Sequence, residues 1–270
     1  MKPASRATPP PAVTPEFEAP ADWWAIDFIS DLHLSELSPG VFDAWAAHMQ
    51  STPANAVFIL GDLFEAWVGD DVPERSFEAR CVSVLRDAAS RKTVAFMAGN
   101  RDFLVGDAML RSAGVFRLAD PTVVAAFGMR ALLSHGDALC LDDVSYQRYR
   151  GVVRQRWIQS AFLALPRAAR ETVGRLMRSR SNSHLRPVQP ALIIDLDEAA
   201  TARWMRTACA PVLVHGHTHA PASHAVGEAG IRHVMTDWHV DAGGAQRAGI
   251  LRWSAAGFAR VAPETTARAT

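Results

Sequence analysis

The sequence predicts an α/β fold. Apolar runs of about five residues alternate with stretches of helical periodicity, and each run ends in a small cluster of polar side chains. Apolar runs of this kind are typical of strands that are buried on both faces of a sheet. In α/β folds the loops at the carboxyl ends of the strands gather the residues that carry the chemistry. We therefore expect the functional site at those loops.

The expected strands are the apolar runs 25–29, 56–60, 94–98, 130–134 and 212–214. The expected helices lie at about 40–50, 74–90, 106–113 and 195–208. The last segment alternates loosely, which indicates two or three more strands near 231–237, 247–253 and 257–261, with Gly243-Gly244 as a turn. Residues 1–21 are rich in Pro and Ala without periodicity, which predicts a disordered tail before a domain that spans 22–270.

Residues 144–186 interrupt the alternation, because they contain no convincing strand and look helical. Apolar side chains recur there at helical spacing: Trp157, Ile158, Ala161, Phe162 and Leu165. This spacing places them on one face of a helix, which Pro166 is expected to end. A second helix is expected near 168–180. The sequence therefore predicts a helical insertion at about 144–190.

Charge is distributed unevenly along a chain that is neutral overall, with 28 Lys and Arg and 28 Asp and Glu. Residues 22–144 carry 18 acidic and 9 basic side chains, whereas residues 145–186 carry ten Arg and one Glu. A nucleic-acid-binding protein usually shows a basic excess over the whole domain. We therefore expect no nucleic-acid partner, and any function has to account for an acidic block followed by a basic block.

The location expected from the sequence is the cytoplasm. No stretch reaches the ~18 uninterrupted apolar residues of a membrane-spanning helix. No apolar run follows Lys2 and Arg6, so no secretory signal is expected. The three cysteines, Cys81, Cys140 and Cys209, are odd in number and widely spaced, which favours free thiols in a reducing compartment.

The polar clusters after the five expected strands contain residues that bind metals. The candidate ligands are Asp31, His33, Asp62, Asn100, His135, His215 and His217. A lone His beside a strand is more often an ordinary polar residue, but five clusters in one order make coincidence improbable. Imidazole and carboxylate together suit Mn, Fe or Zn better than Mg or Ca. Two metals need about eight ligand contacts, which seven residues supply if one carboxylate bridges. We expect Asp62 to bridge, and His219 to orient a ligand or a substrate phosphate.

These clusters resemble the five motifs of the calcineurin-like metallophosphoesterases: Asp31-x-His33, Gly61-Asp62, Gly99-Asn100, His135-Gly136 and His215-Gly216-His217. The resemblance covers roughly residues 25–240. It implies a four-layer fold in which two mixed β-sheets pack face to face between helices. It also implies that Asp31, His33, Asp62 and His217 bind the first metal. The second metal would then bind to Asp62, Asn100, His135 and His215.

Arg101 departs from the pattern of that superfamily, in which the Asn is usually followed by a His thought to protonate the leaving group. Arg cannot act as an acid at neutral pH. Expelling an alkoxide, whose conjugate acid has a pKa near the ~15.7 of water, benefits greatly from such an acid. Expelling a phosphate, whose second pKa is about 6, does not. Arg101 therefore favours cleavage of a phosphoanhydride, and its fork could clamp the second phosphate. The alternative is a structural Arg held by Asp102.

Longer motifs resemble the UDP-2,3-diacylglucosamine hydrolase family: residues 61–71, 99–104 and 135–143, with Tyr146-Gln147 and residues 162–166. The resemblance implies cleavage of the lipid substrate UDP-2,3-diacylglucosamine to UMP and 2,3-diacylglucosamine 1-phosphate (lipid X), a step of lipid A biosynthesis. It implies two Mn²⁺ per chain, with Asp62, Asn100, Arg101 and His135 as the catalytic residues. Substrate contacts are expected by motif at Asn100, Arg101, Asp143 and His215, and by position at Ser181. Arg186 could replace a basic contact in a segment that departs from the family pattern.

The helical insertion would be a cap with an apolar groove for two acyl chains. Trp157, Ile158, Phe162 and Leu165 are candidates for the groove or for contact with a membrane, and packing between helices is the equal alternative. We expect a peripheral protein on the anionic cytoplasmic face of the bacterial inner membrane, with no obligate protein partner. The competing hypotheses are another nucleotide pyrophosphatase or cyclic-nucleotide phosphodiesterase of the same fold, and a catalytically silent scaffold. A scaffold would be expected to lose ligand histidines, which are all present here.

Overall fold

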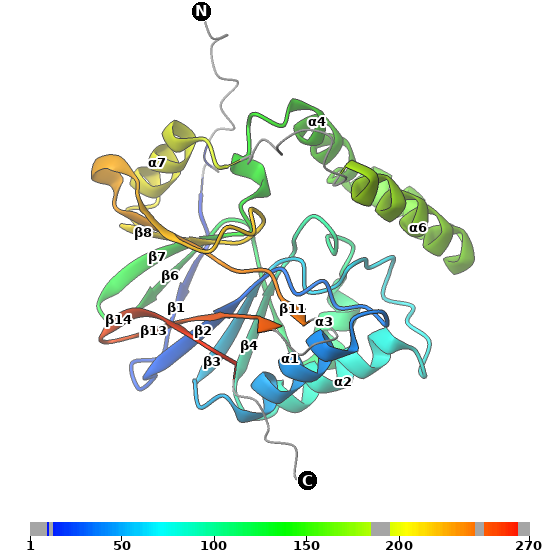
Figure 1. Cartoon of the computed structure of the whole chain (residues 1–270), viewed down its shortest axis with the longest axis horizontal. Coiled ribbons are helices and arrows are strands. Elements are labelled where there is room, and N and C mark those ends of the chain that lie inside the picture. The colour runs from blue at the N-terminus through cyan, green and yellow to red at the C-terminus, as the bar shows by residue number, and fades with distance from the viewer. Residues whose placement is uncertain (1–9, 11–12, 185–194, 241–245, 264–270) are drawn as a thin grey trace, which may run out of the picture.

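Two six-stranded sheets form the centre of the molecule (Figure 1). The computed structural model describes residues 10, 13–184, 195–240 and 246–263. The first sheet has the order β1 (Glu16–Glu18), β6 (Thr122–Ala126), β7 (Met129–Ser134), β8 (Val212–His215), β10 (Ile231–Val234), β9 (Ser223–Ala225). The second has the order β14 (Gly257–Val261), β13 (Ile250–Ser254), β2 (Ala25–Ile29), β3 (Ala56–Leu60), β4 (Thr93–Met97), β5 (Phe116–Leu118). A two-stranded ribbon pairs β11 (His239–Val240) with β12 (Gln246–Arg247).

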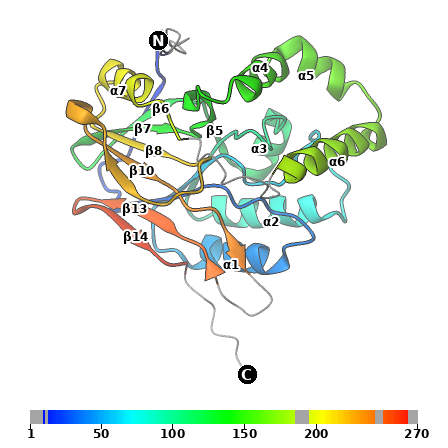
Figure 2. The ribbon, with the colours of Figure 1, turned by 45° about the horizontal axis from the view of Figure 1, so that its top comes forward.

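Each central strand is buried on both faces, which explains why the sequence shows continuous apolar runs there. In β3, Phe58 and Leu60 point into the core between the two sheets, while Val57 and Ile59 point to the other face. That other face packs against α1 (Pro39–Ser51), α2 (Phe77–Ala89) and α3 (Asp107–Ala113). Helix α7 (Glu198–Thr207) covers the outer face of the first sheet (Figure 2). The expected four-layer α/β fold is confirmed.

The expected strands match β2 and β3 in full and β4, β7 and β8 to within one residue at each end. The prediction lacked β1, β5, β6, β9 and the ribbon strands β11 and β12. Strand β6 is joined to β7 by the two-residue turn Phe127-Gly128, in which both residues have positive φ. Such hairpin turns usually carry Asn-Gly or Asp-Gly, and Phe127 conceals the signal. The turn expected at Gly243-Gly244 lies outside the described residues.

Residues 16–18 do not belong to a disordered tail, which corrects the prediction for residues 1–21. They form β1, which pairs in parallel with β6 at the edge of the first sheet. The Phe17 ring lies 5.4 Å from the Phe58 ring, edge to face, and 5.9 Å from the Trp23 ring. The pairing is non-local, so a tail composition rich in Pro and Ala gives no sign of it. Residues 1–9 and 11–12 lie outside the described residues.

The cap insertion is helical, as predicted, but it contains three helices rather than two: α4 (Val144–Val153), α5 (Arg156–Leu163) and α6 (Arg167–His184). Gln155 has extended backbone angles and separates α4 from α5, and Pro166 precedes α6. Neither α4 nor α5 has a buried residue, and the Trp157 side chain is 68% exposed. Packing between helices therefore does not cover Trp157. Among the described residues, no helix has the length and apolar character needed to cross a membrane.

Replacing Phe17 by Ala is expected to lower the free energy of unfolding by about 2 kcal/mol, because the half-buried ring packs on Phe58. Urea unfolding followed by tryptophan fluorescence measures the change. Val13→Ala is the control, because the Val13 side chain is 81% exposed and its loss should matter by less than about 0.5 kcal/mol. Equal stability of Phe17→Ala and the wild-type protein would show that β1 contributes nothing to the fold.

Candidate metal centre

The candidate ligands lie where parallel strands of both sheets end. Strands β2, β3 and β4 are parallel neighbours in one sheet, and β7 and β8 are parallel neighbours in the other. Asp31, Asp62 and Asn100 follow the first three strands, while His135 and His217 follow the other two. Stacking of the two sheets brings these ends together, as the sequence predicted.

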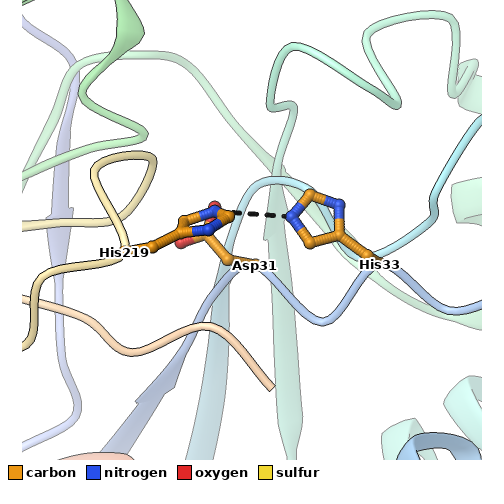
Figure 3. Close-up of side chains that lie close together, drawn as sticks. All are labelled: Asp31, His33 and His219. Atoms are coloured by element: carbon orange, nitrogen blue, oxygen red, sulfur yellow. Dashed lines mark hydrogen bonds and ion pairs between the residues drawn. The ribbon is translucent and has the colours of Figure 1, made fainter. Parts of the chain in front are cut away.

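Asp31 belongs to two groups of potential ligands. It lies with His33 and His219 in one group and with Asp62 and His135 in the other, and within each group the ligand atoms are less than 4.8 Å apart. Figure 3 shows the Asp31 carboxylate beside the His219 ring, which faces the His33 ring; the Nε2 atoms of the two imidazoles are 3.5 Å apart. His219 Nε2 also lies 3.3 Å from Asp31 Oδ1. The geometry therefore places His219, expected as a residue that orients a ligand, beside the ligands themselves.

Asn100 connects His135 with His217 beside this centre. Its Oδ1 lies 3.0 Å from His135 Nε2 and 3.0 Å from His217 Nδ1. The backbone N–H of His217 donates to Asp31, with distances of 3.0 and 3.2 Å to its two carboxylate oxygens. Four residues from four different loops thus share a single network of short contacts.

His215 is buried next to this network but is turned toward a different partner. Its Nδ1 lies 2.9 Å from the carbonyl oxygen of Gly216, and its Nε2 lies 3.2 Å from Nη1 of Arg232. Arg232 is itself paired with Asp195. Burial lowers the pKa of His215 to about 4, so the ring is neutral. Among the described residues, His215 joins neither group of potential ligands.

Negative charge is concentrated in the centre and fits a bound cation. Burial lowers the pKa of His135, but the neighbouring carboxylates of Asp62 and Asp31 outweigh it and raise that pKa to about 9. Burial raises the pKa of Asp31, yet the His219 hydrogen bond and the surrounding imidazoles bring it well below its ordinary value. Buried carboxylates are stable only when paired or bound to a metal. Imidazole and carboxylate donors in this arrangement suit a divalent transition metal.

The loops of the metal centre contain strained backbone, and their glycines allow the backbone to pass close to the ligand carboxylates. Among the described residues, five of the seven non-glycine residues with positive φ are in the centre: Asp31, His33, Asp62, His217 and His219. A left-handed residue other than Gly costs roughly 1–3 kcal/mol. A Cβ on Gly99 would overlap Asp62, and a Cβ on Gly216 would overlap Ser30 Oγ and Asp31 Oδ2. The glycines of the motifs therefore leave room for the carboxylates.

Arg101 is tied to the centre through its backbone and its side chain. Its N–H donates to Asp62 Oδ1 at 2.8 Å, and its Nη1 lies 3.7 Å from Oε1 of Glu65. Glu65 Oε2 in turn lies 3.5 Å from His33 Nδ1. The Asp102 carboxylate accepts backbone N–H groups, including those of Gly99 and Leu63 at 2.8 Å. The sequence prediction overlooked Glu65, although it lies only three residues after Asp62.

The remaining predicted substrate contacts lie in or beside the cap. Asp143 precedes α4 and its Oδ1 accepts the Tyr146 N–H at 2.9 Å, which makes it the N-cap of that helix. Ser181 lies on α6, and Arg186 lies outside the described residues. The structure therefore brings together the metal-binding candidates other than His215, which faces Arg232, and leaves the substrate contacts of the cap as predictions.

Comparison with known proteins identifies the family to which this chain belongs. A sequence profile of the calcineurin-like phosphoesterases matches residues 25–221. A UDP-2,3-diacylglucosamine hydrolase of Chromobacterium violaceum is 40% identical over 227 residues, which cover 82% of this chain and 93% of that protein. Another from Neisseria meningitidis serogroup C is 43% identical over 220 residues, which cover 79% and 90%. This chain belongs to the UDP-2,3-diacylglucosamine hydrolase family of calcineurin-like phosphoesterases.

The family resemblance expected from the motifs is thereby confirmed. A calcineurin-like phosphoesterase binds divalent metal, and the buried donors around Asp31 and Asp62 fit that requirement. Among solved structures, an archaeal phosphodiesterase covers 88% of this chain and 98% of its own, with 10% identity and a TM-score of 0.44. A likeness of that size adds nothing to the assignment.

Gly216→Ala is expected to weaken Mn²⁺ binding by about 10-fold or more, because the added methyl group displaces the Asp31 carboxylate. Isothermal titration calorimetry of the metal-free protein measures the affinity. Gly151→Ala adds the same methyl group where nothing lies within 4 Å, and its metal affinity should equal that of the wild-type protein. Unchanged affinity in Gly216→Ala would show that Gly216 does not make room for Asp31.

Proposed function

We propose that this phosphoesterase hydrolyses the pyrophosphate of UDP-2,3-diacylglucosamine to UMP and 2,3-diacylglucosamine 1-phosphate, a step of lipid A biosynthesis. The observation that carries the proposal is the identity of about 40% with hydrolases of that name, across nine-tenths of their length. Arg101 supports the proposal independently. Its backbone N–H donates to Asp62, so the residue lies at the metal centre, and its guanidinium cannot protonate a leaving group at neutral pH. A phosphate leaving group needs none.

The proposed cofactor is two Mn²⁺ ions per chain. Asp31, His33, Asp62 and His217 would hold the first, and Asp62, Asn100, His135 and His215 the second. His219 is the further candidate beside Asp31, and His215 would have to turn from Arg232 to bind. When bound, such a pair supplies a hydroxide nucleophile at neutral pH and positive charge on the phosphate oxygens.

The protein's own residues would orient the pyrophosphate between that centre and the cap. The Arg101 guanidinium can clamp the phosphate that leaves, since its planar fork donates two parallel hydrogen bonds. Glu65, 3.7 Å from Arg101 Nη1, restrains the direction of that fork. Asn100, Asp143, Ser181, Arg186 and His215 are the other proposed substrate contacts.

The cap surface suits a lipid substrate and an anionic membrane. Trp157, Leu165 and Leu176 are exposed large apolar side chains on or beside α5 and α6, and Arg156 and Arg175 are exposed nearby in the sequence. Figure 1 shows α4 and α6 standing away from the two sheets. Apolar side chains rimmed by Arg are typical of helices that lie on anionic lipid. We therefore place the protein at the cytoplasmic face of the inner membrane.

Purified protein with Mn²⁺ should cleave UDP-2,3-diacylglucosamine and leave ADP-ribose and cyclic AMP nearly intact, as measured by release of UMP from the first and of AMP from the other two. Preference for either of the other substrates would replace the proposed activity by that of a general pyrophosphatase or a cyclic-nucleotide phosphodiesterase.

Asp62→Ala should lower kcat on the order of 10³-fold or more and reduce bound Mn²⁺, because Asp62 is buried within the ligand group. Metal content is measured by inductively coupled plasma mass spectrometry. Asp43→Ala, which removes an exposed carboxylate from α1, is the matched control and should retain both metal and turnover. An active Asp62→Ala protein with full metal content would contradict the ligand assignment.

A further inference from the structure

Asp137 is a buried carboxylate that directly follows the metal-binding motif His135-Gly136 and has no role in the metal centre described above. It begins a single 3₁₀ turn (Asp137–Leu139), and its side chain has no exposed surface. Its Oδ2 accepts the Tyr146 hydroxyl at 2.5 Å and Nε of Arg150 at 2.8 Å. Nη2 of Arg154 lies 3.7 Å from the same oxygen. All three partners come from the cap segment that begins with α4.

The α4 segment is bonded at further points to the loops that carry the metal ligands. Nε2 of Gln147 donates to the carbonyl oxygens of Asp137 and Cys140, at 2.7 and 3.1 Å. Nη2 of Arg154 donates to the carbonyl oxygen of Gly99 at 2.8 Å, immediately before Asn100. The Tyr146 ring lies 5.8 Å from the His217 ring. One end of the cap thus contacts three of the five loops that form the centre.

Polar bonds, rather than apolar packing, hold this end of the cap. Helix α4 has no buried residue, so it presents no apolar face to the sheets. The bonds to Asp137 are charge-assisted or shielded from water, which makes them stronger than ordinary surface contacts. The other end of the cap is held separately, where the buried Arg170 of α6 bonds to the Val68 carbonyl oxygen and to Asp71. Loss of the Asp137 bonds therefore leaves the cap attached but free to shift over the centre.

We propose that Asp137 is a positioning residue that fixes the cap helix α4 in register with the metal centre, so that substrate held by the cap meets the metal-bound site in the productive orientation. The proposal rests on the proposed function, because it assumes a substrate large enough to touch both parts. Misplacement of a substrate by about 1 Å can cost 10²-fold in rate. A small phosphodiester that contacts only the metal centre does not depend on the cap.

The test compares two substrates in three clamp variants and one control variant. Asp137→Asn, Tyr146→Phe and Arg150→Gln each remove part of the clamp, and Arg148→Gln makes the same charge change as Arg150→Gln on the exposed side of the same helix. Turnover of UDP-2,3-diacylglucosamine in mixed detergent micelles is compared with turnover of bis(p-nitrophenyl) phosphate, both with Mn²⁺. The micelles remove any contribution from membrane charge.

In the clamp variants kcat/KM for the lipid substrate should fall by about 10-fold or more, while that for the small diester should change by less than about threefold. Arg148→Gln should leave the ratio of the two values unchanged. Equal loss on both substrates, or no loss on either, would overturn the proposal. A shifted ratio in Arg148→Gln as well would also overturn it, because charge alone would then account for the effect.

Hydrogen–deuterium exchange gives a measure that does not depend on activity. Amides of α4 should exchange faster in Asp137→Asn and Arg150→Gln than in the wild-type protein, with β7 and β8 unchanged, and Arg148→Gln should match the wild-type protein. Unchanged exchange in α4 would overturn the clamp. Wild-type protein that cleaves the diester but leaves UDP-2,3-diacylglucosamine intact would contradict the proposed function, whereas faster exchange in the variants would still support the clamp.

Discussion

Two buried carboxylates, Asp31 and Asp62, set the constraint on which the rest of the structure depends. They lie in one group of potential ligands and are almost fully withdrawn from water. Such charges are stable only if cations or hydrogen-bond donors surround them. The imidazoles of His219 and His135 and the backbone N–H groups of Arg101 and His217 meet part of that requirement. A divalent metal would meet the remainder, and the fold accordingly arranges imidazole nitrogens around the two acids.

The two stacked sheets provide the rigidity that such a centre needs. Strands buried on both faces hold the ends of five loops in fixed positions, and left-handed backbones at Asp31, His33 and Asp62 persist because the surrounding core allows no relaxation. Motif glycines are part of the same arrangement, since Gly99 and Gly216 pass where a Cβ would strike a carboxylate. Strain and close approach in the loops are thus offset by apolar burial in the strands.

The arginines of the basic block, residues 145–186, have two different roles in the structure. Arg150, Arg154, Arg167 and Arg170 bond to carboxylates or carbonyl oxygens of the main body and so attach the cap. Arg156 and Arg175 stay exposed and remain candidates for contact with anionic lipid. The acidic block has two roles as well. Asp137 and Asp71 pair with the arginines of the cap, and Asp31 and Asp62 are candidate metal ligands. Neutral overall charge therefore conceals pairing within the protein.

The sequence by itself determined the buried strands, the family and the metal-binding candidates, because strands with two apolar faces and the polar clusters behind them are local patterns. It could not show that residues 16–18 add a strand to β6, that His219 stands beside Asp31, or that His215 faces Arg232. Nor could it assign Asp137 to the cap rather than to the metal. These features depend on pairings between residues far apart in the chain, and only the packing of the two sheets and the cap decides which groups meet.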